Sequence, residues 1–381
     1  MILSLAAAEI INRLLDASFE AFAVGGAVRD VIMGRRPNDF DIATNARTDE
    51  IKALFPDKLV IPTGEKHGTV TVLCSGEPIE VTTFRIDGNY NDSRHPETVT
   101  FVNDVTMDLA RRDFTVNAIA YNDSRGFIDP FGGIEDIKRC VIRAVGDAET
   151  RFREDALRIM RCIRFASVLG FSIDKDTDLA LSKCYQLLGE VSVERIYSEL
   201  KLFLAGDFQA LIEEYSYIFE FLFHGWKAPN THLTHGESDV LTRMAYFFSG
   251  ADVSAASSYL SFLKSDNATK KGVISILNAL RYPLISSQAD ALRFLSEYGY
   301  EASKRAVFLR GRDEEIGLIE ELRDYCYSID RLEIDGKDIS LLGYRGSDIG
   351  KAKKLLLQAV IEGKVTNEKD KLLNFLARQT I

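Results

Sequence analysis

The sequence is poor in cysteine, and its few cysteines are not arranged to bind a structural metal. It has five in 381 residues, an odd number, and they are widely separated with no Cys-x-x-Cys pair. This spacing argues against a disulfide framework and against a structural zinc site. We therefore expect a protein of a reducing compartment and predict a cytoplasmic location.

Long hydrophobic runs are also missing from the sequence. No apolar run reaches the roughly 18–20 residues that are needed to span a bilayer. The apolar start, residues 1–8, has no basic residue before it and continues directly into Glu9-Ile10-Ile11. We predict an amphipathic first helix here, rather than a signal peptide, and expect no membrane partner.

Positive charge is in the minority, because 47 basic residues face 57 acidic ones and give a net charge of −10. A chain that coats nucleic acid without selectivity would be basic overall, so we expect no DNA partner. A local basic stripe remains compatible with RNA binding. The densest candidate comprises Arg151, Arg153, Arg158, Arg161 and Arg164.

The pattern of hydrophobic residues changes near residue 135. Before this point, short β-rich runs alternate with Gly, Pro, Asp and Asn, whereas afterwards apolar residues recur three and four apart and strand signals nearly vanish. The sequence therefore predicts an α+β fold, with a small head containing a mixed or antiparallel sheet followed by an all-α remainder. The predicted strands cover residues 21–24, 40–44, 69–73, 79–84 and 98–102.

Asp39-Phe40-Asp41 is the most informative short motif in the chain. Residues two apart on a strand point to the same face, so we expect both carboxylates to face one point with Phe40 buried behind them. Two carboxylates on a rigid element are suited to a Mg²⁺ ion that also holds substrate phosphates. Taken alone, Asp-x-Asp is more often a surface turn.

A Gly25-Gly26 pair precedes this motif by about a dozen residues. It separates an apolar strand, residues 21–24, from a helical stretch, residues 27–33, and its backbone N–H groups are suited to phosphates. Taken alone, Gly-Gly is usually only a tight turn. The order and separation of the two motifs together predict nucleotidyl transfer.

Glu80 is a third candidate for this chemistry. A charged residue inside a β-rich run lies either on the solvent face or in a site. Because Asp39 and Asp41 are expected in the same sheet, we assign Glu80 to the site, where it would bind metal or deprotonate the attacking hydroxyl.

The segment Arg111–Ala118 combines charged, polar and apolar residues. Arg112 is suited to clamp a triphosphate through two parallel hydrogen bonds, which Lys does not form. Asn117 is suited to hydrogen-bond a ribose or phosphate oxygen. The alternative is a solvated helix start with a surface arginine pair.

Asp155 and Arg158 lie three residues apart in a stretch with helical periodicity, so we predict that they share one helix face. One interpretation is a surface salt bridge of little energetic value. The other is base recognition, because Asp offers only acceptors and Arg only donors. Cytosine and adenine both place an amino donor beside a ring-nitrogen acceptor, while uracil and guanine reverse this order. A fixed Asp–Arg pair therefore favours C and A and opposes U and G.

These residues resemble, block by block, the class II tRNA nucleotidyltransferases of bacteria, the CCA-adding enzymes. All five family motifs occur in the family's order between about residues 20 and 200. They are residues 25–30 with Asp39 and Asp41, residues 111–118, residues 129–133, residues 154–158 with Arg161, and residues 192–195. The remaining chain matches only loosely, most clearly at residues 334–339.

The resemblance implies four regions: a head (1–135), a neck that reads the incoming base (136–205), a helical body (206–310) and a helical tail (311–381) that grips the tRNA elbow. It implies template-independent addition of C, C and A to the 3′ end of tRNA from CTP and ATP, with release of pyrophosphate and Mg²⁺ as cofactor. The implied catalytic and metal-binding residues are Asp39 and Asp41, with Glu80 beside them. The implied nucleotide-binding residues are Gly25, Gly26, Arg29, Arg112, Asn117, Asp155, Arg158, Arg161 and Arg164.

Several alternatives remain open at this level. The chain is either a full CCA-adding enzyme, an A-only or CC-only enzyme, a poly(A) polymerase, or a nucleotide-binding RNA-interaction protein without catalysis. The polar loop at residues 85–98 resembles the loop that CC-adding members of the family lack, so the resemblance favours full CCA addition. Poly(A) polymerases of this group usually carry a basic C-terminal extension, which this sequence does not show, so the resemblance disfavours that activity. The five histidines include no His-Asp doublet, so phosphohydrolase activity is not implied. We expect a monomer or a homodimer.

Overall fold

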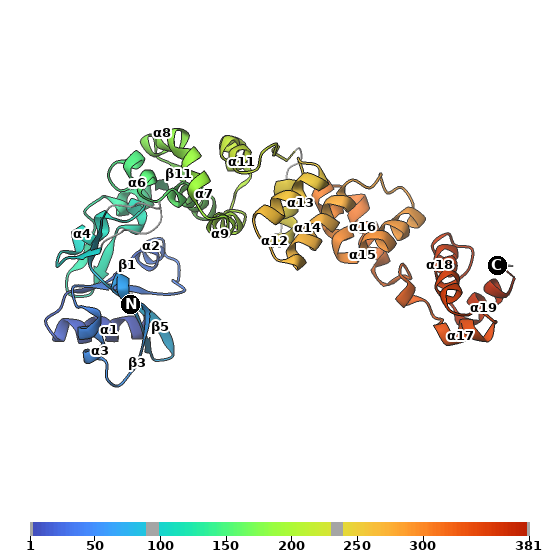
Figure 1. The fold of residues 1–381 in the computed structure, drawn as a ribbon, viewed down its shortest axis with the longest axis horizontal. Coiled ribbons are helices and arrows are strands. Elements are labelled where there is room, and N and C mark those ends of the chain that lie inside the picture. Colours follow the sequence, from blue (N-terminus) through green and yellow to red (C-terminus); the bar gives the residue numbers. More distant parts are fainter. Residues whose placement is uncertain (1–2, 89–98, 230–238, 379–381) are drawn as a thin grey trace. The chain divides into compact units, whose positions relative to one another are not determined.

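The computed structural model describes residues 3–88, 99–229 and 239–378. The chain divides into two compact units, Met1–Leu222 and Phe223–Ile381. Figure 1 shows strands together with helices in the first unit and helices in the second. The α+β prediction, with helices following a sheet-containing head, is thereby confirmed. The four-region boundaries near 135, 205 and 310 stay predictions.

The first unit is built on a seven-stranded mixed sheet with the order β3-β4-β5-β2-β1-β8-β9. Strand β2 pairs in parallel with β5, and every other neighbouring pair is antiparallel. Its strands are β1 (Ala21–Val24), β2 (Asp41–Thr44), β3 (Leu59–Gly64), β4 (Thr69–Cys74), β5 (Glu77–Thr83), β8 (Ala120–Asn122) and β9 (Gly126–Ile128). All four residues of β1 are buried, as expected for an apolar central strand.

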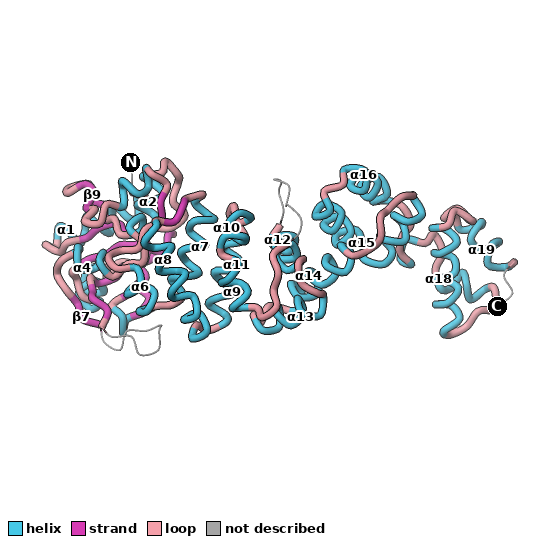
Figure 2. The backbone as a smooth tube through the Cα atoms, turned by 90° about the horizontal axis from the view of Figure 1, so that it is seen from above, coloured by secondary structure: helices cyan, strands magenta, loops and turns pink. Residues whose placement is uncertain are grey.

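The helices of the first unit begin with α1 (Leu5–Asp16), the amphipathic helix that the sequence predicts (Figure 2). Ser4 caps its N-terminus, and Ile10, Ile11 and Leu14 are among its buried residues. The other helices are α2 (Gly26–Ile32), α3 (Thr48–Leu54), α4 (Val105–Ala110), α5 (Gly133–Lys138), α6 (Ala148–Glu154), α7 (Leu157–Leu169), α8 (Lys175–Cys184), α9 (Val193–Phe203), α10 (Gln209–Glu214) and α11 (Ser216–Leu222), with 3₁₀ turns η1 (Glu65–His67), η2 (Thr115–Asn117) and η3 (Tyr185–Glu190).

Two small sheets correct the sequence analysis. β6 (Arg85–Asp87) pairs antiparallel with β7 (Val99–Phe101), so the predicted loop begins with a strand, and its residues 89–98 lie outside the described residues. β10 (Val141–Ile142) pairs in parallel with β11 (Ser172–Ile173), within the region that was expected to be helical. Such two-residue strands depend on a partner 31 residues away and leave no periodic signal of their own.

The second unit is helical throughout its described residues. Its elements are α12 (Val240–Phe248), α13 (Val253–Phe262), α14 (Asn267–Leu280), α15 (Gln288–Arg310), α16 (Asp313–Glu321), α17 (Gly336–Leu341), α18 (Ser347–Ile361) and α19 (Lys369–Ala377), with 3₁₀ turns η4 (Leu322–Asp324) and η5 (Ile329–Arg331). A buried cluster that includes Phe294, Leu295, Leu356 and Leu372 forms its core from α15 to α19. Helix α15 is kinked at Gly299, whose φ of 75° and ψ of 164° are not helical.

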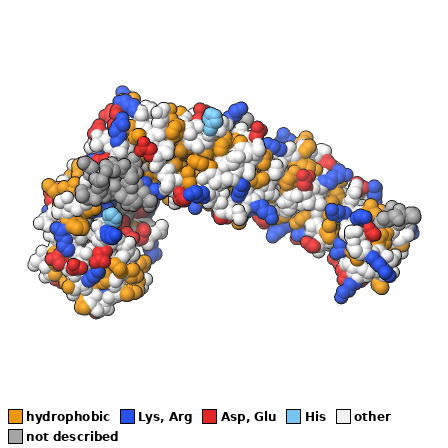
Figure 3. Space-filling model, in the orientation of Figure 1, with side chains coloured by type: hydrophobic (Ala, Val, Ile, Leu, Met, Phe, Trp, Pro, Cys, Tyr) orange, Lys and Arg blue, Asp and Glu red, His pale blue; other side chains and the backbone are white. Residues whose placement is uncertain are grey.

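The surface of the last helices carries many Lys and Arg side chains, as Figure 3 shows for one face. Lys337, Arg345, Lys354 and Lys371 are among the exposed ones. Among the helices described here, none combines the length and the apolar character that crossing a bilayer requires.

Candidate active site

The predicted glycine turn lies between β1 and α2. Its first residue, Gly25, lies so near the side chain of Arg112 that only glycine fits without displacing it. Gly25 has a φ of 74°, which favours glycine. A Cβ atom added there would lie 2.9 Å from Nη1 of Arg112 and 4.0 Å from Oδ2 of Asp41. Gly25 therefore faces two predicted site residues, and any side chain at this position would push the guanidinium away.

The carboxylates of the site come from β2 and β5. Parallel pairing places Asp41 directly opposite Glu80 in register, as their predicted roles require. Phe40 is buried as expected, but β2 begins at Asp41, so Asp39 precedes the strand and the same-face argument does not extend to it. Among the described residues, no group of three acidic, His or Cys side chains is already assembled as a metal cage.

The surroundings of Asp41 disfavour the negative charge of its carboxylate. Burial raises the pKa of Asp41, and the negative charges of Glu80 and Asp39 raise it further, while Arg112 opposes them. Nearby carboxylates that repel one another form a donor set that a divalent cation would relieve. The residues present therefore fit a metal ion with oxygen ligands.

Arg112 is held at the site by few protein contacts. Its Nη2 lies 3.5 Å from Oδ2 of Asp108, and its Nη1 donates to the carbonyl of Asn117 at 3.5 Å. Its Nε is buried without a hydrogen-bond partner in the described structure, and burial lowers the pKa of the guanidinium. Nη1 of the guanidinium faces Gly25, and a guanidinium is suited to bind an anion.

Asp108 is a site residue that the sequence analysis did not identify. It is fully buried on α4 and accepts from Nε of Arg111 at 2.9 Å, close to Arg112. The sequence does contain a signal for these contacts. Arg111 and Arg112 follow Asp108 by three and four residues, which are the spacings at which side chains meet on a helix.

Arg29, Asn117 and Asp113 form a buried relay of hydrogen bonds. Nη1 of Arg29 donates to Oδ1 of Asn117 at 2.7 Å, and Nδ2 of Asn117 donates to Oδ1 of Asp113 at 3.1 Å. The Asn117 side chain is therefore engaged at both ends with protein groups, and its direct contacts fix Arg29.

Asp113 continues the relay toward α7. Its Oδ2 accepts from Nε and Nη2 of Arg161, at 2.8 and 2.7 Å. Burial alone would raise the pKa of Asp113, but Arg161, Asn117 and the backbone N–H of Phe114 together lower it to about 2. Asp113 lies within the motif at residues 111–118, but no role was predicted for it from the sequence.

Replacing Asp113 with asparagine is expected to lower the free energy of unfolding of the first unit by about 2 kcal/mol at pH 7, since the folded-state pKa lies nearly two units below the ordinary value. A depressed carboxyl pKa stabilises the fold above about pH 4, and this contribution fades as the pH falls toward 2. Urea unfolding of both proteins at pH 7 and pH 3 measures the difference. A difference that stayed constant between these pH values would contradict the assignment.

The structure corrects the predicted helix around Asp155 and Arg158. Helix α6 ends at Glu154, and Asp155 adopts an extended conformation (φ −140°, ψ 103°) before α7 begins at Leu157. Asp155 caps the N–H of Leu157 and accepts from Nη2 of Arg195 at 2.9 Å. The predicted shared helix face is therefore wrong, because an acceptor that caps the next helix interrupts the first.

Arg158 is buried and bound to other groups. It pairs with Glu154 at 2.6 Å and donates to the carbonyls of Arg151 and Arg111 at 3.0 and 2.9 Å. No ion pair joins Arg158 to Asp155 in the described part of the chain, so the salt-bridge interpretation does not hold. Both side chains are instead fixed independently by the protein.

Arg161 and Arg164 meet a carboxylate that the sequence analysis missed. Glu199 on α9 is buried and lies 2.9 Å from Nε of Arg164 and 3.6 Å from Nη1 of Arg161. The guanidinium of Arg164 also lies over the ring of Phe165, 3.5 Å from its centroid. Much of the predicted basic stripe is therefore neutralised internally. A pairing over 35 or more residues leaves no local signal.

Comparisons with known proteins agree with this architecture. Residues 21–143 match the family model for the poly A polymerase head domain, which defines the class of the sheet-containing part. Residues 170–223 match the model for the probable RNA and SrmB-binding site of polymerase A.

Relatives and solved structures define the family. A CCA-adding enzyme of Lactobacillus delbrueckii subsp. bulgaricus is 36% identical over 97% of this chain and 96% of its own length. A crystal structure of the Bacillus stearothermophilus CCA-adding enzyme in complex with CTP has a TM-score of 0.77 at 32% identity, covering 97% of this chain and 96% of that one. The chain belongs to the family of CCA-adding enzymes, as its motifs predicted.

Some other relatives have a higher sequence identity over a shorter aligned segment. The CCA-adding enzyme of Geobacillus thermodenitrificans is 53% identical over 201 residues, which are 53% of this chain and 49% of that enzyme. In that alignment, the chain spans about half the length of its relative.

Proposed function

We propose that this protein adds C, C and A to the 3′ end of tRNA from CTP and ATP, without a nucleic-acid template and with release of pyrophosphate. The single observation that carries the proposal is the convergence of Gly25, Asp41 and Arg112, with Glu80 opposite Asp41. Membership of the family and the CTP complex of a 32% identical structure support it.

We assign a Mg²⁺ site to Asp39 and Asp41, with Glu80 beside them. The raised pKa of Asp41, caused by burial and by its two carboxylate neighbours, supports a cation at this point. Bound there, Mg²⁺ would favour deprotonation of the attacking 3′-hydroxyl and stabilise charge on the departing pyrophosphate. Glu80 is the candidate base for that hydroxyl proton.

The phosphates and sugar of the incoming nucleotide are assigned to Gly25, Gly26, Arg29 and Arg112. The position of Arg112 supports this role, because its Nη1 faces Gly25 and a guanidinium forms paired hydrogen bonds with phosphate oxygens. Asn117 acts in this account by holding Arg29 in place.

The base of the nucleotide is assigned to Asp155 and Arg158, supported by Arg161 and Arg164. Asp155 keeps its carboxylate fixed through Arg195, and Arg158 is fixed through Glu154 and two carbonyls. Rigid placement by the protein supports a template, because a donor and acceptor pattern discriminates bases only if it cannot rearrange.

The RNA partner is tRNA, and the helical tail is the candidate grip for its elbow. Exposed basic residues on the last helices, such as Lys337, Arg345 and Lys354, support contacts to phosphates in a chain that is acidic overall (Figure 3). The cytoplasmic location and the oligomeric state stay predictions.

A sequencing gel tests the proposed function directly. A tRNA that ends at the discriminator base is incubated with Mg²⁺ and CTP, ATP or both. We expect two added residues with CTP alone and three with both nucleotides. Addition that stops at CC with both nucleotides would indicate a CC-only enzyme. A second tRNA, which already ends in CC, is tested in parallel, and addition of A to this tRNA alone would indicate an A-only enzyme. A long adenylate tail would indicate a poly(A) polymerase, and no addition would indicate a binding protein.

A further inference from the structure

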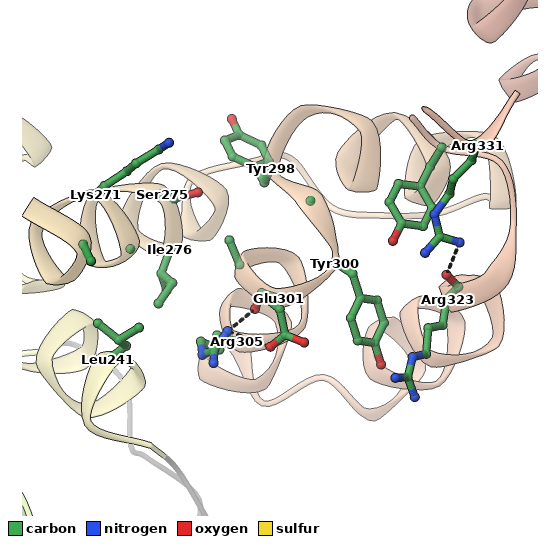
Figure 4. A pocket seen from close by; sticks show the side chains of 15 residues that line it. Leu241, Lys271, Ser275, Ile276, Tyr298, Tyr300, Glu301, Arg305, Arg323 and Arg331 are labelled. Carbon is green, nitrogen blue, oxygen red and sulfur yellow. Dashed lines mark hydrogen bonds and ion pairs between the residues drawn. The ribbon is translucent and has the colours of Figure 1, made fainter. Parts of the chain in front are cut away.

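A cavity of about 680 Å³ lies in the second unit, away from the residues assigned to catalysis. Its walls come from α14, from both sides of the kink in α15, and from the segment that carries η4 and η5 (Figure 4). The kink at Gly299 interrupts α15 between Tyr298 and Tyr300, and both tyrosines line the cavity. The positive φ of 75° at Gly299 favours glycine, so this wall depends on that residue.

The lining of the cavity is basic in a chain that is acidic overall. Lys271, Arg305, Arg323 and Arg331 line it together with one carboxylate, Glu301. Arg305 is neutralised, because it pairs with Glu301 at 2.8 Å and with Asp239 at 2.6 Å. Across the described residues, Lys271, Arg323 and Arg331 have no carboxylate partner. Three positive charges therefore remain available to an anion.

Two of these arginines are stacked on aromatic rings. The guanidinium carbon of Arg323 lies 5.4 Å from the ring centroid of Tyr300, and that of Arg331 lies 4.4 Å from the ring centroid of Tyr327. Nη1 of Arg331 also donates to the carbonyls of Arg323 and Tyr325, which fixes its position (Figure 4). Stacked guanidinium groups keep N–H donors at their edges for phosphate oxygens.

We infer that this cavity binds a segment of the RNA substrate, with separate phosphates at Lys271 and at Arg323 and an unpaired base stacked on the pair that Arg323 forms with Tyr300. Cations without carboxylate partners beside aromatic faces are the combination that unpaired RNA requires, because its charge lies on the phosphates and its bases stack. The inference rests on the proposed function, which makes tRNA the RNA in question.

Three exposed or half-buried positions test this inference by binding rather than turnover. Arg323→Gln, Lys271→Gln and Tyr300→Leu are compared with wild type by fluorescence anisotropy of labelled tRNA lacking CCA, over a range of salt concentrations. We expect each variant to weaken tRNA binding about five- to tenfold, and each charge-removing variant to reduce the salt slope by about one. The KM for CTP should stay unchanged.

Lys227→Gln is the matched control, since Lys227 is exposed in the same unit and does not line the cavity. Equal weakening by Lys227→Gln, wild-type binding by Arg323→Gln and Tyr300→Leu, or a change confined to the KM for CTP would each overturn the inference. Selective loss of tRNA binding in a chain that incorporates no nucleotide would contradict the proposed function while supporting this inference.

Discussion

Replacing Asp41 with asparagine is expected to lower incorporation of CMP into tRNA by at least about a thousandfold, the equivalent of roughly 4 kcal/mol of transition-state stabilisation. Asp41 begins β2 directly opposite Glu80 and lies beside Gly25 and Arg112. Losing its charge would remove a carboxylate from the proposed metal site. Single-turnover incorporation of labelled CMP measures the loss.

Glu77→Gln is the matched control, because Glu77 is an exposed acid on the same strand as Glu80. It should retain near-normal incorporation, and circular dichroism should show both variants folded. A folded Asp41→Asn protein with near-normal incorporation would remove Asp41 from the metal site.

Replacing Asp155 with alanine is expected to raise the use of UTP relative to CTP by about ten- to a hundredfold, while some total turnover survives. An unpaired polar group in a recognition pocket costs about 1–3 kcal/mol, which sets this range. Asp155 is the better choice than Arg158, because Arg158 is buried and donates to two carbonyls, so its removal also destabilises the fold. Incorporation from each of the four nucleoside triphosphates singly provides the readout.

Glu149→Ala serves as the comparison, since Glu149 is a charged residue on α6 that pairs with Lys183. It should leave the preference for CTP and ATP intact. If Asp155→Ala also kept the full preference, the carboxylate would serve only to hold Arg195 and cap Leu157. The template would then lie elsewhere, with Arg161 as the next candidate.

Local signals were sufficient for the centre of the head. The apolar run at 21–24 became a fully buried strand and the run at 69–73 became β4, because a short run of β-branched and apolar residues marks a strand locally. In β4 the residues Val70, Thr71 and Val72 are all buried, so burial there does not alternate. The glycine turn and Asp41 were found from the same local signals, since the turn directly follows β1 and Asp41 begins β2.

Long-range pairing was beyond these signals. Arg161 meets Asp113 across 48 residues, and Arg164 meets Glu199 across 35, so neither partner is visible in a local pattern. The break at Asp155 was missed because a capping side chain overrode the apolar periodicity around it. Strand β3 was not predicted from the sequence. Most of its residues are exposed, and its apolar and polar residues do not alternate as they do in a half-buried strand.

A crystal structure of the chain with CTP and Mn²⁺ tests the central claim most directly, because it locates the metal and the base at once. The account predicts anomalous Mn²⁺ density in contact with Asp39 and Asp41, the triphosphate against Gly26, Arg29 and Arg112, and the cytosine edge facing Asp155 and Arg158. Manganese bound away from both aspartates, or a cytosine that contacted neither Asp155 nor Arg158, would contradict it.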